Sequence, residues 1–211
     1  MAINVEKKVF SPGVDNVLQF NVVTARGEAL SVNSYQHPDL FWALRGGGGG
    51  TYAIVTSTVY KTYDTSRMAS VSISATDLSR EVARAVQSRF VGMLANLSDM
   101  AWSGYGYLAP NGLTVTLFAQ NFTKEEANKV LQPFLKFVRD ETAGGQPPQI
   151  TSALYESFYD WFLPAFPPET DDSGDARFEL GSRFLYREMA TQNPGKVADI
   201  LIALPGRTRI K

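Results

Sequence analysis

The sequence contains no cysteine and only one histidine, His37, among its 211 residues. Without a thiol, the chain can form no disulfide, thiolate metal site or cysteine nucleophile. Cysteine content therefore does not indicate in which redox compartment the protein resides. A lone histidine has no second imidazole to share a metal ion with, so we expect His37 to be a solvated loop residue. The sequence therefore predicts no metal site.

An excess of charge of either sign is also absent, since 20 Lys and Arg stand against 21 Asp and Glu, a net charge of -1. No positive field exists to gather nucleic acid or an anionic membrane surface. No apolar run reaches the roughly 20 residues that cross a bilayer, and residues 1–10 lack the apolar core of a signal peptide. We expect a soluble protein without nucleic-acid or membrane partners, of unassigned localisation.

The composition, 44% hydrophobic and 19% charged, is that of a globular protein with one large domain or two small ones. Periodicity and turn signals locate the secondary structure, and the order of elements predicts an α+β fold with an antiparallel sheet covered on one face by helices. Strands are expected at 17–25, 28–32, 51–63, 68–75, 101–108, 113–121 and 183–189, helices at 40–44, 82–97, 124–138, 152–162 and 194–204, and an exposed loop at 169–176.

Local signals set several of these boundaries. Arg26-Gly27 and Pro110-Asn111-Gly112 each separate two strand-like runs, so both pairs of strands are expected to form hairpins. Thr123 and Glu126 have capping-box spacing, in which each side chain satisfies a main-chain N–H at the start of a helix.

Five consecutive glycines, Gly46 to Gly50, are the most informative segment. Main chain without β-carbons can approach a ligand closely and offer N–H groups to it, although flexible loops and helix ends use the same residues. No Lys-Ser or Lys-Thr follows the run, so it is not a Walker loop. Because it follows a helix and enters a strand, it is not a Rossmann turn either.

The context of the run is more specific. The sequence from Gly13 to Tyr63 resembles the end of the FAD-binding domain in the vanillyl-alcohol-oxidase and p-cresol-methylhydroxylase (PCMH-type) superfamily, particularly its berberine-bridge-enzyme-like branch. The resemblance is carried by Val14-Asp15-Asn16-Val17-Leu18, Val22-Val23-Thr24-Ala25-Arg26-Gly27, Pro38-Asp39-Leu40-Phe41-Trp42-Ala43-Leu44-Arg45 and Gly46 through Thr56. It implies FAD as cofactor, contacted by Gly48, Gly49, Gly50, Tyr52, Ile54 and Val55.

The resemblance also implies supporting roles around the turn. We expect Leu40, Phe41 and Leu44 to pack inward and Arg45 to bond nearby carbonyls or carboxylates. The family usually has glycine where this chain has Ala53, and a β-carbon there would crowd the flavin ring.

Residues 1–64 are accordingly expected to be the C-terminal part of an FAD-binding domain, and residues 65–211 part of a substrate-binding α+β domain. The second half resembles the family more loosely, through element order and the cluster Phe158-Tyr159-Asp160-Trp161-Phe162. The implied activity is oxidation of a small organic substrate, such as a specialised metabolite, by hydride transfer to flavin. Four tyrosines can line a substrate site, but we expect core packing for each: Tyr105, Tyr107, Tyr155 and Tyr159.

The resemblance leaves part of the family pattern unmatched. Family members, which are often secretory, carry an N-terminal histidine, often with a cysteine, for flavin attachment, and a C-terminal tyrosine segment; neither is found here. We expect a chain truncated at both ends, through a shortened gene model, an alternative start or a degraded copy, and the alternative function is an inactive remnant or interaction protein.

Exposed faces of strands 17–25 and 51–63 predict self-association. Asp171, Asp172 and Asp175 lack calcium-loop spacing and are expected to be solvated.

Overall fold

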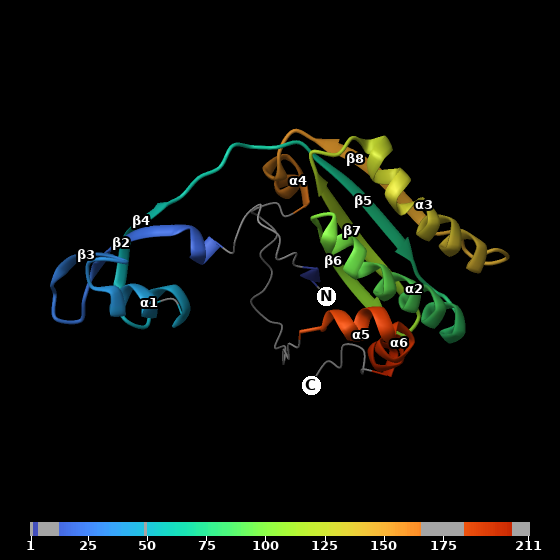
Figure 1. The fold of residues 1–211 in the computed structure, drawn as a ribbon, viewed down its shortest axis with the longest axis horizontal. Helices are drawn as coiled ribbons and strands as arrows, with labels where there is room; N and C mark the ends of the chain where they lie inside the picture. Colours follow the sequence, from blue (N-terminus) through green and yellow to red (C-terminus); the bar gives the residue numbers. More distant parts are fainter. Residues whose placement is uncertain (1, 4–12, 49, 166–183, 204–211) are drawn as a thin grey trace. The chain divides into compact units, whose positions relative to one another are not determined.

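The computed structural model describes residues 2–3, 13–48, 50–165 and 184–203 (Figure 1). Contacts divide the chain after residue 64 into two compact units. The smaller unit ends at Asp64, and the larger unit contains the rest of the chain together with a short strand from the beginning of the sequence. Each unit is described by itself.

The smaller unit is a three-stranded antiparallel sheet with one helix on it. A short 3-10 helix, η1 (Gly13–Asn16), leads into β2 (Val17–Val23), which pairs with both β3 (Ala29–Asn33) and β4 (Ile54–Tyr60). The strand order is β3-β2-β4, so β4 is an edge strand. The predicted hairpin of residues 17–32 is confirmed, whereas the strand predicted for 51–63 is shorter than expected because residues 50–52 still belong to the turn.

Helix α1 (Pro38–Gly46) covers one face of this sheet. It begins at Pro38, a residue that favours the first turn of a helix. Phe41 is buried against Phe20, with ring centroids 5.8 Å apart. Leu40 and Leu44 pack at the margin of the same core, so the inward packing predicted for these residues is confirmed. The core consists of Val17, Phe20, Val22, Val32, Phe41 and Ala53.

The larger unit is built on a five-stranded antiparallel sheet of order β1-β6-β7-β5-β8. Its strands are β1 (Ala2–Ile3), β5 (Met68–Ala75), β6 (Trp102–Ala109), β7 (Gly112–Gln120) and β8 (Gln149–Tyr155). The predicted hairpin at Pro110-Asn111 is confirmed, because Ala109 pairs with Gly112 across the turn. Strand β1 pairs with β6 through Ala2 opposite Tyr105 and Ile3 opposite Gly104.

Helices α2 (Arg80–Asp99) and α3 (Lys124–Glu141) cover one face of this sheet. Odd-numbered residues of β5 and β7, such as Val71 and Leu117, meet α2 and α3 residues in one buried core. The capping box is present, with Thr123 Oγ1 accepting from Glu126 N at 3.2 Å and Thr123 N donating to Glu126 Oε2 at 2.8 Å. The predicted α+β class, with an antiparallel sheet covered on one face by helices, is confirmed.

Two further helices, α5 (Arg187–Gln192) and α6 (Pro194–Ala203), pack on α2 through a small core of Val91, Ala190 and Val197 (Figure 1). Two ion pairs, Arg84 with Asp199 and Arg187 with Asp99, reinforce this contact at its exposed margin. No helix in the described ranges is both long enough and apolar enough to span a bilayer.

Three expectations about the larger unit are wrong. Residues 152–155, predicted to begin a helix, belong to β8, which pairs with β5 from Met68 to Ser74; of the predicted range, only the part in α4 (Phe158–Ala165) is helical. Residues 187–189 begin α5 instead of ending a strand, since Ala190 is buried against α2. The alternation of small polar and apolar residues over 68–75 predicts a strand buried on one face only, but β5 is buried on more than one face, since Met68 and Ser70 are 2% and 5% exposed. The expected loop at 169–176, with its aspartates, lies outside the described residues.

Candidate functional site

The glycine run forms an ordered turn at the end of α1. The N–H of Gly47 donates to the carbonyl of Ala43 over 2.8 Å, which continues the helical pattern for one more residue. Gly48 and Gly50 have φ angles of 93° and 71°, in the left-handed region that residues with a β-carbon rarely adopt. Glycine is therefore required at these two positions. Gly49, predicted to contact FAD, lies outside the described residues.

Thr51 braces this turn from within. Its hydroxyl group lies 2.9 Å from the carbonyl oxygen of Gly47 and 2.5 Å from that of Gly48, so its single O–H is shared between them. A β-carbon on Gly47 would overlap the ring of Tyr52, which packs directly on the main chain there. The turn is thus held by its own residues. The sequence analysis did not single out Thr51, although a threonine after a glycine run is a local hydrogen-bonding signal.

The turn leads directly into the free edge of the smaller sheet. Among the described residues β4 pairs with β2 alone, so its other side presents main-chain N–H and C=O groups that the described strands do not use. Tyr52, Ile54 and Val55 are 52%, 70% and 42% exposed. Ile54 stands opposite Val23 and Val55 opposite Val22, so the two side chains point to opposite faces of the sheet. A flat ligand can contact both residues only along the edge.

Ala53 lies in the core beneath α1, with 9% of its surface exposed. Its methyl group packs near Phe41 and Val22 and is turned away from solvent. The β-carbon that was expected to crowd the flavin ring thus belongs to the core of the smaller unit.

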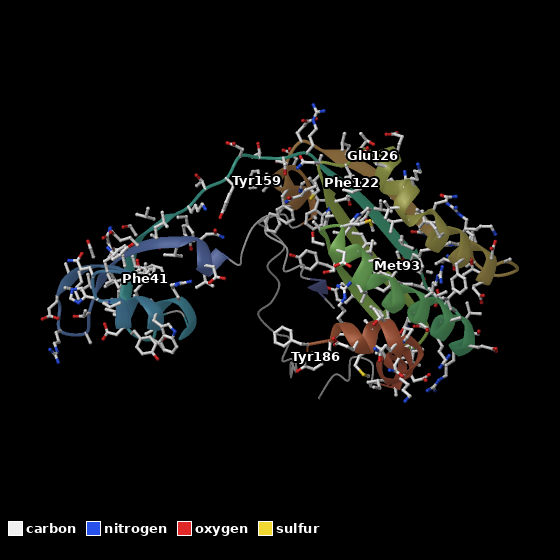
Figure 2. The ribbon with its side chains drawn as sticks, viewed as in Figure 1. Phe41, Met93, Phe122, Glu126, Tyr159 and Tyr186 are labelled. Atoms are coloured by element: carbon white, nitrogen blue, oxygen red, sulfur yellow. The ribbon has the colours of Figure 1, made fainter. Side chains whose placement is uncertain are left out.

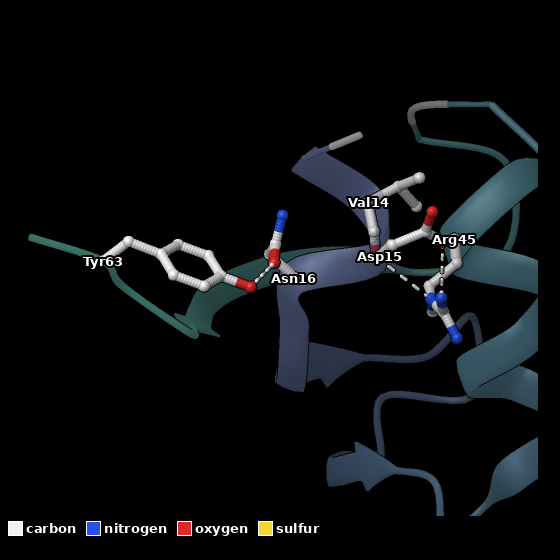
Figure 3. A network of polar contacts seen from close by, with 5 residues as sticks. All are labelled: Val14, Asp15, Asn16, Arg45 and Tyr63. Atoms are coloured by element: carbon white, nitrogen blue, oxygen red, sulfur yellow. Dashed lines mark hydrogen bonds and ion pairs between the residues drawn. The ribbon is translucent and has the colours of Figure 1, made fainter. Parts of the chain in front are cut away.

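The start and end of the smaller unit are joined by polar contacts (Figure 3). Arg45 donates from Nε to the Val14 carbonyl at 3.1 Å and from Nη2 to Asp15 Oδ1 at 2.9 Å, as predicted for this residue. The phenol of Tyr63 donates to Asn16 Oδ1 at 2.8 Å. These contacts fix the segment before β2 to the end of α1 and to the segment after β4.

The chemistry of the turn and edge fits the ring of a flavin better than its phosphates. No charged residue occurs between Gly46 and Tyr60. A flat heteroaromatic ring needs a side-chain-free surface and main-chain donors and acceptors at its rim, which this segment supplies. The segment offers a pyrophosphate neither a cation nor a helix N-terminus, since the turn leads into a strand.

The candidate tyrosines of the larger unit lie on or beside the sheet face opposite α2 and α3. Tyr105, Tyr107 and Tyr159 are 54%, 72% and 63% exposed, and Tyr155 is half-buried, so the core packing expected for the first three is wrong. Tyr159 belongs to α4, on which Figure 2 labels it. The alternation of apolar and polar residues along a strand does not show which elements cover each face of the sheet.

Aromatic rings gather where α4 meets this open face. Phe118 of β7 contacts Trp161 edge-on, with centroids 4.5 Å apart, and also lies near Phe158 and Tyr105 at 6.2 and 6.3 Å. Such edge-on pairs contribute more than their buried area alone. They fix α4 against β7 and leave Tyr105 at the margin of the cluster.

Two carboxyl groups of the described residues have pKa values lowered by hydrogen bonds. The hydrogen bond from Arg84 lowers the pKa of Asp199, and the hydrogen bond from the Thr123 main chain lowers the pKa of Glu126; both groups have structural roles. His37 is exposed, as expected, and stands just before α1 with a φ of 54°. Among the described residues, no three His, Asp or Glu side chains gather as metal ligands would.

Comparisons with known proteins agree with this geometry. No family model matches the chain. An uncharacterized FAD-linked oxidoreductase of Arthroderma benhamiae is 32% identical over 205 residues, which are 90% of this chain and 34% of that protein. The FAD-linked oxidoreductase easE of Aspergillus fumigatus is 67% identical over 43 residues, 20% of this chain and 7% of that protein. The crystal structure of the VAO-type flavoprotein MtVAO615 of Myceliophthora thermophila matches 90% of this chain and 34% of its own, with 25% identity and a TM-score of 0.69.

The fold is that of a VAO-type flavoprotein. The chain belongs to the FAD-linked oxidoreductases of the PCMH-type superfamily, whose cofactor is FAD. It spans about a third of the length of the curated relatives that it matches along most of its sequence.

Proposed function

We propose that this chain is part of an FAD-dependent oxidoreductase that oxidises a small organic molecule, such as a specialised metabolite, by hydride transfer to flavin. Residues 1–64 are the end of its FAD-binding domain and residues 65–211 part of its substrate-binding domain. The observation that carries the proposal is the braced glycine turn that opens into an uncharged, exposed edge strand.

In this proposal the turn and the edge of β4 hold the rim of the flavin ring. The main chain of Gly48, Gly49 and Gly50 lies against the ring, with Gly49 included from the sequence alone. Tyr52, Ile54 and Val55 exclude water beside it, since each exposes a large apolar surface that binding would cover. The bound FAD supplies an electron-poor ring that accepts a hydride.

Thr51 has a positioning role. Its hydroxyl occupies the carbonyls of Gly47 and Gly48, so these oxygens are engaged within the turn. A lone pair on a carbonyl oxygen facing a flavin ring would repel the negative charge that the ring gains on reduction. With these two carbonyls engaged by Thr51, the turn presents fewer oxygen lone pairs to a bound flavin.

The substrate surface that we propose is the open face of the larger sheet. It offers exposed phenols on β6 and hydroxyl groups on β7 and β5, which can bind and orient a small molecule.

FAD binding by the purified chain tests the proposal. Protein of residues 1–211 is titrated with FAD, and the flavin absorption near ~450 nm and the flavin fluorescence are followed. We expect saturable binding that perturbs both signals. Gly48→Val, which places a side chain at a φ of 93°, should abolish it, while Gly13→Ala, at a position with open space around it, should not. A folded chain that leaves the flavin spectrum unchanged would favour the inactive remnant or interaction protein.

A further inference from the structure

A groove of about 620 Å³ lies between α2 and α3 of the larger unit, beside the first residue of α6. This volume is within the range of small-molecule sites. Its lining is mostly apolar and includes Met93 and Leu97 of α2, Val130 and Phe134 of α3, and Pro194 of α6; Figure 2 labels Met93. Because α2 and α3 cover one face of the sheet, the groove belongs to the helical layer and not to the open face.

Gly92, in the middle of α2, keeps part of the groove open. A β-carbon at this position would lie 3.7 Å from Pro194, in ordinary van der Waals contact, so packing does not demand a glycine. Glycine in the interior of a helix is also less favourable than alanine. Neither the helix nor its neighbours therefore explain this glycine, whereas a ligand lying across α2 would need the space.

The charge of the groove has one sign. Among the described residues, Arg84 and Arg89 are its only charged lining residues, and both come from the first half of α2. Arg84 is engaged by Asp199, with Nε 2.5 Å from Oδ1 and Nη2 2.9 Å from Oδ2. Arg89 has no carboxylate partner in the described part of the chain, and its guanidinium carbon lies 5.9 Å from the centre of the Phe137 ring. Arg89 is thus a cation available to an anionic ligand.

The cation and the apolar lining follow one another along α2. With a rise of about 1.5 Å per residue, Arg89 and Met100 are about 16 Å apart along the helix axis, the length of a saturated chain of about a dozen carbons. The lining residues of α2 between them are Gly92, Met93, Asn96 and Leu97, none of which is charged. Methionine side chains such as Met93 adapt readily to the shape of an apolar ligand.

We propose that this groove binds an amphipathic monocarboxylate of the fatty-acid type. Its hydrocarbon chain covers Met93, Leu97 and Val130, which favours binding through the apolar area removed from water. Its carboxylate accepts hydrogen bonds from the guanidinium of Arg89. The groove uses none of the residues proposed to contact the flavin, so this proposal goes beyond the proposed function and can fail without it.

Two amphiphiles with the same chain, dodecanoate and dodecylammonium, test the proposal at concentrations below micelle formation. Binding to residues 1–211 is measured by calorimetry, and the amide signals of Gly92 and Met93 are followed by NMR. We expect dodecanoate to bind saturably and roughly fivefold more tightly than dodecylammonium, the discrimination that one exposed ion pair provides. Added salt should reduce this preference. Equal binding of the two, or unchanged signals of Gly92 and Met93, would overturn the proposal.

Matched variants locate the ligand. Gly92→Leu fills the groove and should weaken dodecanoate binding at least roughly tenfold, while Gly92→Ala, which adds a single methyl group in ordinary contact, should have a much smaller effect. Arg89→Gln should weaken binding roughly fivefold and Arg89→Lys less, since lysine keeps the charge. Arg139→Gln removes an exposed arginine of α3 that does not line the groove and should change nothing. Circular dichroism verifies each fold, and unchanged affinity of Gly92→Leu or Arg89→Gln would contradict the proposal.

An anionic membrane surface is the other source of amphipathic anions. Sedimentation with phosphatidylglycerol vesicles distinguishes it from a free ligand, which we expect, so the chain should remain in the supernatant. Sedimentation with the vesicles that Arg89→Gln abolishes would show that the cation meets a lipid surface, and the proposal would be wrong.

Discussion

The side chain of Gln87 on α2 donates from Nε2 to the main-chain carbonyl of Ala109 at 2.7 Å. A second bond from the same nitrogen reaches the carbonyl of Gly112 at 3.0 Å. Gln87 is fully buried, so one amide from a helix fixes both sides of the β6–β7 turn in a region without water. Nothing in the local sequence distinguishes this glutamine from a surface residue.

We expect Gln87→Met to lower the free energy of unfolding by about 1–3 kcal/mol, because it removes both bonds to the turn while preserving volume. Gln132→Met on α3, an exposed position, is the matched control and should change stability little. Urea unfolding followed by circular dichroism measures both. Equal stability of the two variants would show that the buried amide bonds contribute nothing net.

The capping box makes stability depend on pH. The pKa of Glu126 is lowered from its ordinary value of 4.5 by the hydrogen bond from the Thr123 main chain. A group with a depressed folded-state pKa stabilises the fold above its unfolded-state pKa, and this contribution is lost as the pH falls through the lower folded-state value. We therefore expect the unmodified chain to lose its advantage over Glu126→Gln below a pH of 4.5. Glu125→Gln, one residue earlier on α3, should not reproduce this convergence in thermal unfolding across that range.

Substitutions of two exposed apolar residues of β4 should have different effects on FAD affinity. Ile54→Glu places a charge within the proposed flavin contact, and we expect FAD affinity to fall roughly tenfold or more. Val59→Glu adds the same charge to the same strand, outside that contact, and should leave affinity nearly unchanged. Ile54 and Val59 are 70% and 46% exposed, so neither change disturbs a core. Fluorescence titration with FAD makes the comparison, and equal losses would place the cofactor elsewhere.

The same edge is the expected route of self-association. Val59→Lys should reduce the proportion of dimers and larger species, because a lysine on an edge strand opposes pairing with another edge. Tyr35→Lys, at a residue that is 96% exposed near the start of α1, adds the same charge elsewhere. Sedimentation velocity over a range of concentrations tests this. A chain that remains monomeric without any substitution contradicts the prediction.

Elements that depend on local chemistry could be predicted from the sequence. The Thr123–Glu126 box, the turn at Pro110 and the start of α1 at Pro38 each involve residues within a few positions of one another. Strand β8 could not, because its strand character comes from pairing with β5, as in Met68 opposite Tyr155. Helix α5 likewise depends on the distant partner Asp99 for Arg187.

The candidate site divides in the same way. The left-handed φ angles of Gly48 and Gly50 are local features of a kind that glycine permits. That Ala53 points into the core, or that β4 is an edge, depends on which strands pair, and a sequence of alternating apolar residues is equally compatible with a central strand. The exposure of Tyr107 depends on which elements pack on its face of β6, and the sequence of the strand does not contain that information.

In the sequence, the smaller unit is inserted into the larger one. Strand β1 precedes the smaller unit and pairs with β6, which follows it. Its own two ends lie together: Asn16 accepts at its carbonyl from Lys61 N and at Oδ1 from Tyr63. A module closed at its base in this manner can unfold and refold as a single step, without requiring its host to open. Protection of the amide hydrogens of β2 and β4 should then report one common free energy of opening, separate from that of β5 and β7.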